Sequence, residues 1–214
     1  IIDEIPDPKA DINGDLQFQP ALLDYNEYVG RIGIGKVHSG TIKVNEMVSC
    51  VRLDGSIKQF RIQKLFGFDG LKRVEINEAD AGDIVAIAGL MDISVGETVC
   101  NVGKEKALPI LRIDEPTLKM TFMVNNSPFV GREGKIVTAR KIGERLFKET
   151  QKDVSLKVEE SGNESWTVSG RGELHLSILI ENLRREGFEL QVSKPEVIIK
   201  EIDGVKCEPY EDVQ

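Results

Sequence analysis

The chain has 214 residues, a formal net charge of −8, 40% hydrophobic residues and 30% charged residues. This is the composition of an ordinary soluble protein that buries a core in one or two domains. It contains no apolar run near the roughly 18 residues of a membrane helix. Its three scattered cysteines indicate a reducing, cytoplasmic compartment and exclude a disulfide framework.

The first hundred residues have the pattern of short strands. Residues 1–15 are acidic and contain two prolines, so we expect a linker from a domain upstream. Residues 16–106 alternate apolar and polar side chains between Gly and Asp turns, which predicts a closed β-barrel. The expected strands are 16–25, 30–37, 41–44, 47–52, 56–66, 84–88 and 98–102.

The second half mixes strands and helices. After a proline-containing linker at 107–116, residues 117–193 predict a strand at 117–125, a Gly-rich loop at 129–135, a helix at 136–150, and strands at 154–158 and 165–169. A turn, a helix and a final strand follow within 168–192. This order predicts the ferredoxin-like βαββαβ arrangement, with two helices on one sheet face. Residues 194–214 read as the start of a further, truncated unit.

The second helix shows the clearest periodicity. Leu176, Ile180 and Leu183 predict its buried stripe, and Leu174 and Ile178 widen that stripe. Glu181 and Arg185 are spaced to form an ion pair on the solvent-exposed face of the helix. Gly187 is placed to cap the C-terminus of the helix in the left-handed conformation.

One segment matches the motif of a phosphate-binding loop only in part. Residues 30–36 fit GxxxxGK, but Val37 follows where Ser or Thr should hold Mg²⁺, and the segment alternates like a strand. The guanine-reading N-K-x-D is absent. We expect no nucleotide, cofactor or metal to bind this chain.

Neither histidine predicts a catalytic base. His175 lies one residue from the apolar stripe, and the sequence suggests neither a nucleophile nor a carboxylate to pair with it. We therefore expect it at an interdomain or surface contact. We expect His38 to be a turn residue.

The loop at 125–134 leaves an enzymatic alternative open. A strand-to-helix loop that carries Arg132 and free backbone N–H groups can bind phosphate on a ferredoxin-like fold, as in acylphosphatases. Fold analogy alone is a weak warrant for function.

Residues 132–152 concentrate positive charge, with seven basic and three acidic side chains. They could contact RNA phosphates, which positions a protein without reading sequence. They could equally form a solvated helix face on which Glu144 and Glu149 pair with the bases. Trp166 is the only Trp, so we do not expect stacking on single-stranded RNA.

Several motifs carry a family resemblance. Residues 169–176, Ser-Gly-Arg-Gly-Glu-Leu-His-Leu, resemble a signature of the third domain of elongation factor G and its relatives, and Lys-Pro-Glu-Val at 194–197 resembles the entry to their next domain. Ala-Gly-Asp-Ile-Val-Ala-Ile-Ala-Gly-Leu at 81–90 resembles their second domain, as do the matching positions Gly30, Arg31, Gly35, Val37, Gly40, Thr41, Lys43 and Val48. The runs at 16–25, 28–35, 125–134 and 197–201 resemble the TypA/BipA family most.

This resemblance implies a piece of a ribosome-associated, GTP-binding translation factor without its GTPase domain, in which GTP and Mg²⁺ belong to the missing part. It implies a cytoplasmic role in ribosome assembly and stress growth, with rRNA, ribosomal proteins and the missing domains as partners and no membrane. We expect phosphate contacts from Arg31, Lys36, Lys43, Arg132, Lys135, Arg140, Lys141 and Lys148. We expect Arg171 and His175 at a domain or ribosomal-protein contact. A non-ribosomal protein-interaction module remains the other alternative.

Overall fold

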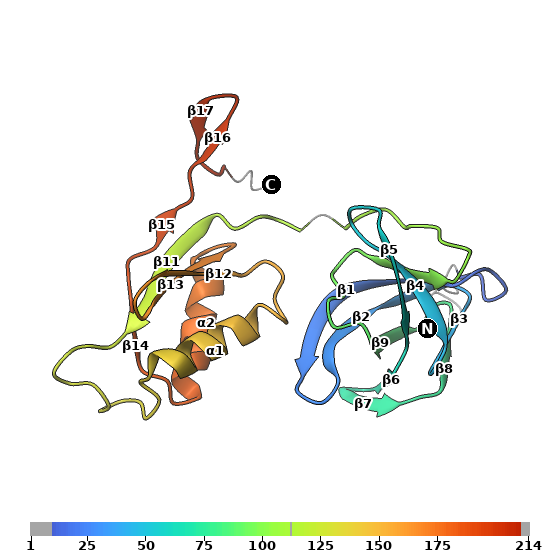
Figure 1. Cartoon of the computed structure of the whole chain (residues 1–214), viewed down its shortest axis with the longest axis horizontal. Helices are drawn as coiled ribbons and strands as arrows, with labels where there is room; N and C mark the ends of the chain where they lie inside the picture. Colours follow the sequence, from blue (N-terminus) through green and yellow to red (C-terminus); the bar gives the residue numbers. More distant parts are fainter. Residues whose placement is uncertain (1–9, 112, 211–214) are drawn as a thin grey trace, which may run out of the picture. The chain divides into compact units, whose positions relative to one another are not determined.

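The computed structural model describes residues 10–111 and 113–210. The chain divides into two units, Ile1–Arg112 and Ile113–Gln214, which Figure 1 colours from blue to red along the sequence. Residues 1–9 of the expected linker and 211–214 of the expected terminal unit lie outside the described residues.

The first unit is built from strands. They are β1 (Gln17–Asn26), β2 (Gly30–Ser39), β3 (Thr41–Lys43), β4 (Met47–Val51), β5 (Ile57–Arg61), β6 (Lys64–Asp69), β7 (Lys72–Glu75), β8 (Glu78–Asp80), β9 (Ile84–Ala88) and β10 (Thr98–Asn101). Eight of them form one antiparallel sheet in the order β5-β4-β10-β1-β2-β9-β6-β7, and β3 pairs with β8 in a separate ribbon.

The strand order requires this sheet to curl. Strands β5 and β6 are first and seventh in the order, and only residues 62 and 63 connect them. At about 4.8 Å between strands, a flat sheet would hold them nearly 30 Å apart, which so short a link cannot span. The strands therefore wrap around a common interior (Figure 1). Phe18 on β1 faces Val37 and Val99 across the ladder, and all three are completely buried.

The prediction of a closed barrel is wrong in one respect. Among the described strands, the edges β5 and β7 do not pair with each other. The expected strand at 56–66 is broken because Ile62 donates its N–H to Glu46 O and Gln63 to Ala88 O, so the chain changes partners there. Gly89 makes room for this crossing, since a Cβ there would lie 2.2 Å from Arg61 O. Strands β7 and β8 lie within 67–83, where no strand was expected.

The second unit contains β11 (Leu118–Val124), α1 (Ala139–Glu149), β12 (Lys157–Gly162), β13 (Ser165–Gly170), α2 (Glu173–Arg185) and β14 (Leu190–Val192). The sheet order β12-β13-β11-β14 is antiparallel throughout, as the βαββαβ arrangement requires. Both helices pack on one face (Figure 1), where Phe122 and Val168 meet Leu146 and Leu183 in a single core. The ferredoxin-like prediction is confirmed.

Three local predictions need correction. Helix α1 begins at Ala139 instead of 136, because the backbone of Ile136 is bonded to Gly187 O and to the N–H of Glu189. The strand expected at 154–158 starts at Lys157, since Asp153 accepts the N–H of Ser155 and holds a turn there.

The third correction concerns the buried face of α2. Leu176, Leu179 and Leu183 are its buried residues, whereas Leu174 is 74% exposed and Ile178 is 53% exposed. The prediction that Leu174 and Ile178 widen the buried stripe is therefore wrong, because they lie on the exposed side of the helix.

The end of α2 follows the sequence prediction. Gly187 has φ +89°, its N–H bonds to Arg184 O at 2.9 Å, and the N–H of Phe188 bonds to Leu183 O at 3.0 Å. These two bonds define a Schellman cap. The predicted pair of Arg185 with Glu181 is present at 2.9 Å.

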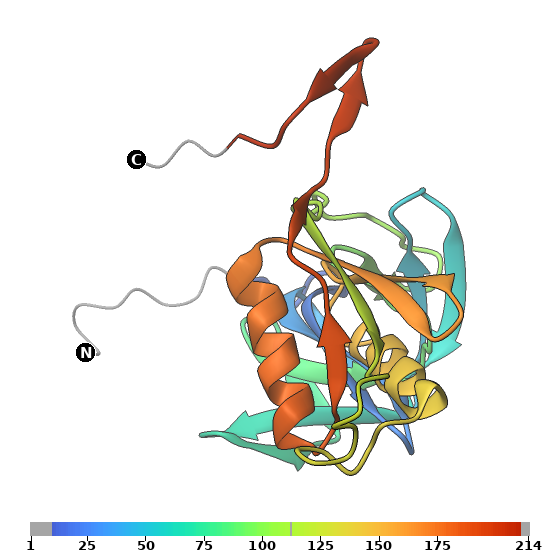
Figure 2. The ribbon, with the colours of Figure 1, turned by 90° about the vertical axis from the view of Figure 1, so that its left-hand side faces the viewer.

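The chain then continues into three short strands, β15 (Glu196–Val197), β16 (Lys200–Ile202) and β17 (Val205–Cys207). Strand β15 pairs with β11, so it extends the sheet of the second unit. Strands β16 and β17 form a hairpin whose turn residues Asp203 and Gly204 both have positive φ. In Figure 2 this hairpin projects away from the sheet of its unit.

Candidate nucleic-acid interface

The segment that resembles a phosphate-binding loop, residues 30–36, is the first part of β2. Its backbone pairs with β1 on one side and β9 on the other, so its N–H groups are committed to the sheet. Gly35 has a packing reason of its own, because a Cβ there would lie 1.9 Å from Gln19 O. The described residues therefore do not fit a nucleotide phosphate at this place. They also contain no cluster of three or more metal-ligating side chains.

The three basic residues predicted as contacts in the first unit are differently engaged. Arg31 is half-buried and donates from Nη1 to Ile93 O at 3.1 Å, and burial lowers its pKa. Lys43 is exposed and forms an ion pair with Glu78 at 3.1 Å, which raises its pKa. Lys36 and His38 both lie on β2, so the expectation that His38 is a turn residue is wrong. Burial, and then the nearby charge of Lys36, lower the pKa of His38.

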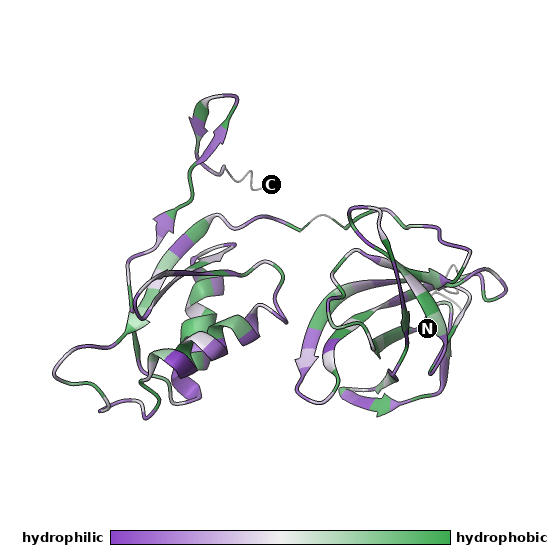
Figure 3. Cartoon of the chain, in the orientation of Figure 1, coloured by the Kyte–Doolittle hydropathy of each residue, from purple (hydrophilic) through white to green (hydrophobic). Residues whose placement is uncertain are grey.

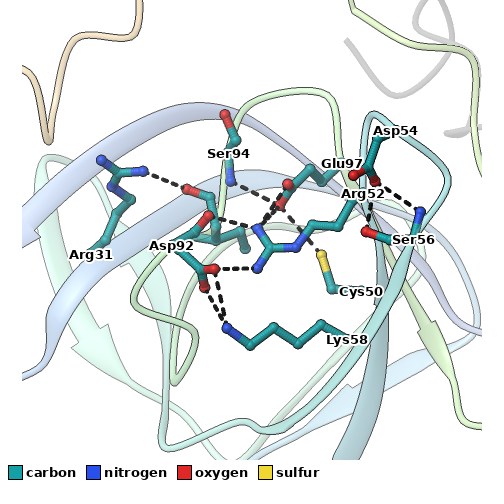
Figure 4. Close-up of polar contacts among 10 residues, drawn as sticks. Arg31, Cys50, Arg52, Asp54, Ser56, Lys58, Asp92, Ser94 and Glu97 are labelled. Atoms are coloured by element: carbon teal, nitrogen blue, oxygen red, sulfur yellow. Dashed lines mark hydrogen bonds and ion pairs between the residues drawn. The ribbon is translucent and has the colours of Figure 1, made fainter.

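A charged cluster inside the first unit was missed by sequence reasoning (Figure 4). The Glu97 side chain is 4% exposed and its Oε1 lies 2.9 Å from Nη1 of Arg52. Arg52 also contacts Asp92 at 2.6 Å, and Asp92 pairs with Lys58 at 3.1 Å. Each basic residue lies far in the sequence from its acidic partner, 45 residues for Arg52 and Glu97 and 34 for Lys58 and Asp92, so no local motif predicts the cluster.

This cluster is structural in character. Cys50 donates its thiol to Glu97 at 3.4 Å, and burial followed by the nearby Glu97 charge raises the pKa of Cys50 to about 12. A thiol with that pKa stays protonated and is a poor nucleophile. The hydrogen bond from Arg52 lowers the pKa of Asp92 to about 2. The two acidic side chains, Asp92 and Glu97, are therefore each paired with a basic side chain of the same unit, Glu97 in a buried place and Asp92 at the surface.

The loop between β11 and α1 is held by one carboxylate. Glu189 accepts the backbone N–H groups of Gly131 at 3.0 Å, Glu133 at 3.1 Å and Gly134 at 2.9 Å, and the side-chain amide of Asn125 at 2.5 Å. The bond from Gly134 is the main reason that the pKa of Glu189 falls to about 2. We call residues 125–135 the latched loop.

The latch bears directly on the acylphosphatase alternative. That alternative needs free N–H groups in this loop to hold a phosphate, and the carboxylate of Glu189 already fills the cradle they form. An incoming anion would have to displace a negative charge that the chain itself supplies. The geometry of the described residues thus disfavours phosphate chemistry at this loop.

The predicted basic residues of the latched loop remain accessible. Arg132 is exposed, and its guanidinium lies 4.7 Å from the centroid of the Phe129 ring. Lys135 is exposed too. Sequence reasoning named both cations but missed the aromatic ring beneath Arg132.

Helix α1 carries three further predicted contacts on its outer side, which is largely hydrophilic in Figure 3. Arg140 and Lys141 are exposed, and Lys148 is half-buried in the last turn. Arg140 pairs with Glu144 at 2.8 Å, as the solvated-face alternative anticipated.

Arg145 links α1 to the end of α2. It contacts Glu149 at 2.5 Å and Glu186 at 2.6 Å, and its side chain is only 17% exposed. Its charge is therefore balanced within the second unit.

The two remaining predicted residues meet at the start of α2. The backbone N–H of Arg171 points to Nδ1 of His175 at 3.3 Å, and Nε2 of His175 lies 2.6 Å from Asp153 Oδ2. Because Nδ1 accepts, Nε2 carries the proton and donates to Asp153. The expectation that no carboxylate pairs with His175 is wrong, while the side chain of Arg171 is exposed as a contact residue requires.

Comparison of the sequence with known proteins relates the chain to translation factors. Residues 30–100 match the family described as Elongation factor Tu domain 2, so the first unit is a translation-factor domain. Over its whole length the chain is 68% identical to the large ribosomal subunit assembly factor BipA of Bacillus subtilis and 52% identical to that of Escherichia coli K12. It is 51% identical over 99% of its length to the same factor of Synechocystis.

The chain belongs to the BipA (TypA) family. It spans about 35% of the length of the curated relatives that it matches. No helix in the described part of the chain could span a membrane.

Proposed function

We propose that this chain is the ribosome-docking part of a BipA-like translational GTPase that acts in large-subunit assembly, including under stress, in the cytoplasm. The proposal is carried by the sequence identity of 52–68%, over the full length of this chain, to proteins named as large ribosomal subunit assembly factors. In this proposal the chain performs no catalysis, and GTP and Mg²⁺ are bound by another part of the protein.

The proposed contacts to rRNA are electrostatic. Arg132, Lys135, Arg140 and Lys141 are exposed on the latched loop and on α1 of the second unit, and Lys148 lies on the same helix. Lysine and arginine that neutralise phosphates release counterions, so affinity falls as salt rises. In the first unit Lys43 is the better candidate, because it is exposed whereas Arg31 and Lys36 are both half-buried. Arg171 is proposed to contact a ribosomal protein or a neighbouring domain, and His175 to hold the turn beside it.

Co-sedimentation with purified ribosomes and large subunits across a salt series tests this proposal. Reversal of Arg140, Lys141 and Lys148 to Glu should weaken pelleting at low salt and flatten its salt dependence. A matched control reverses Lys72, Lys157 and Lys206, which are exposed elsewhere and give the same change in net charge. Equal loss in both variants would show that only overall charge matters, and unchanged pelleting of the first variant would remove α1 from the interface.

A further inference from the structure

The tip of the latched loop presents an aromatic ring to solvent. The side chain of Phe129 is 60% exposed, and its neighbour Val130 is 45% exposed. Single exposed apolar residues are common, but this ring also carries the guanidinium of Arg132 at 4.7 Å. Arginine over an aromatic face is a cation–π contact, which keeps the ring and the charge together in one place.

The loop that carries this pair is ordered by its own hydrogen bonds. Besides the Glu189 latch, Asn125 Oδ1 accepts the N–H of Ser127 at 3.0 Å and the side-chain amide of Gln191 at 3.0 Å. Gly134 is packed so closely that a Cβ would lie 2.8 Å from the Cβ of Glu189. A loop already fixed in shape loses little conformational entropy when it binds a partner.

The chemistry of the tip suits an unpaired nucleotide. A flat ring can stack on any base, and an adjacent arginine can contact the phosphate beside it. Within 125–135 Arg132 and Lys135 outnumber Glu133, and the Glu189 carboxylate that holds the loop is bonded to its backbone N–H groups. An apolar pocket on a protein would have to desolvate the guanidinium over the ring, which makes that partner less suitable.

We infer that the latched loop binds an unpaired RNA nucleotide, whose base stacks on Phe129 and whose phosphate meets Arg132. The inference rests on the proposed docking to rRNA and names one contact within it. It also revises the expectation, based on the single Trp, that stacking has no place in this chain. Glu189 is a positioning residue here, because it acts through the loop backbone.

The test is chemical probing of rRNA bases in complexes of the chain with large ribosomal subunits. The wild-type chain should protect one or a few unpaired bases, and Phe129→Ala should lose that protection. Affinity should fall about five- to one-hundred-fold, as for other base-stacking side chains replaced by alanine. Phe129→Tyr should keep the protection, whereas Phe129→Leu, which retains apolar bulk without a ring, should lose it.

The outcomes separate this inference from the proposed function. Pelleting of the wild-type chain with no base protection that depends on Phe129 would overturn the inference and leave docking intact. Wild-type behaviour of Phe129→Leu would indicate an apolar protein contact and would also overturn it. If the chain does not pellet at all, docking fails. An unstructured RNA oligonucleotide titrated against the chain then decides: NMR shifts centred on Phe129 and Arg132 would sustain the inference, and their absence would end it.

Discussion

Each unit of the chain contains a carboxylate that organises its surroundings, and the two achieve this by different means. Glu97 in the first unit is 4% exposed and is neutralised by the guanidinium of Arg52. Glu189 in the second unit has no cation among its hydrogen-bond donors and is satisfied by backbone N–H groups and an amide. The first depends on one partner charge in a buried place, and the second on several weak dipoles near solvent.

The difference predicts how each region fails. A buried charge that loses its partner leaves an uncompensated ion in low dielectric, which is costly. A surface carboxylate held by N–H groups can be protonated or replaced with local loss of order only. Removal of the charge that pairs with Glu97 should therefore lower the stability of the whole first unit. Protonation of Glu189 should instead disturb only the latched loop of the second unit.

The largest expected effect comes from Arg52→Ala. Removal of the guanidinium leaves Glu97 buried and unpaired, and the free energy of unfolding of the first unit should fall by about 3–5 kcal/mol. Urea unfolding followed by circular dichroism measures the change. Fluorescence of Trp166, the single Trp, reports the second unit and should keep its midpoint. Alkylation of the buried Cys50 should accelerate as the first unit opens.

Lys58→Ala is the matched control for that prediction. Lys58 pairs with Asp92 in the same cluster, but both side chains are more than half exposed. Exposed pairs contribute about 0–1 kcal/mol. A loss as large as that of Arg52→Ala would show that burial does not govern this cluster.

The second prediction is a titration of the latched loop. The folded pKa of Glu189 is about 2, below its ordinary value of 4.5. A carboxylate with a lowered folded pKa stabilises the folded state above the ordinary pKa. That contribution is lost as the pH falls from about 4.5 toward 2. The amide NMR signals of Gly131 and Gly134 should therefore shift with a midpoint near pH 2.

Glu189→Gln supplies the control for the titration. Its neutral amide does not take up a proton in this range, so the shift of the two glycine signals should vanish while the rest of the spectrum is retained. A midpoint near 4.5 in the wild-type chain would mean that the backbone donors do not hold the carboxylate in solution.

The smallest effect is expected from Glu144→Gln on α1. Its pair with Arg140 is exposed on both sides, and such pairs add little to helix stability. The thermal midpoint should change by little more than the measurement error. Ribosome pelleting at low salt should increase slightly, because Arg140 no longer has a competing carboxylate. A large fall in thermal stability would show that this surface pair matters as much as the buried one.

The parts of the fold that the sequence predicted rest on local chemistry. Gly187 marked the helix cap because a left-handed residue was needed there. The strand at 84–88 followed from an apolar run bounded by turn residues. These signals lie within a few residues, so one sequence is enough to read them.

The missed features depend on contacts between distant residues. On α2 the stripes through Leu174 and Leu179 are both apolar, and only packing against the sheet decides which is buried. Glu97 meets Arg52 across 45 residues, and Glu189 meets Gly134 across 55. In each case the residues that neighbour the glutamate in the sequence do not predict which distant group it contacts.

The pairing of β11 has a consequence for the solution behaviour of the second unit. One side of β11 is used by β14 and then by β15, so the chain supplies its own strands where a foreign strand could have added. The opposite edge, β12, exposes Lys157, Glu159 and Glu160. Charged edge strands resist recruitment of a second sheet. Addition of a foreign strand to the folded unit is thus opposed at the β12 border, and any such pairing would have to use the other border, where β14 and β15 are the outermost strands.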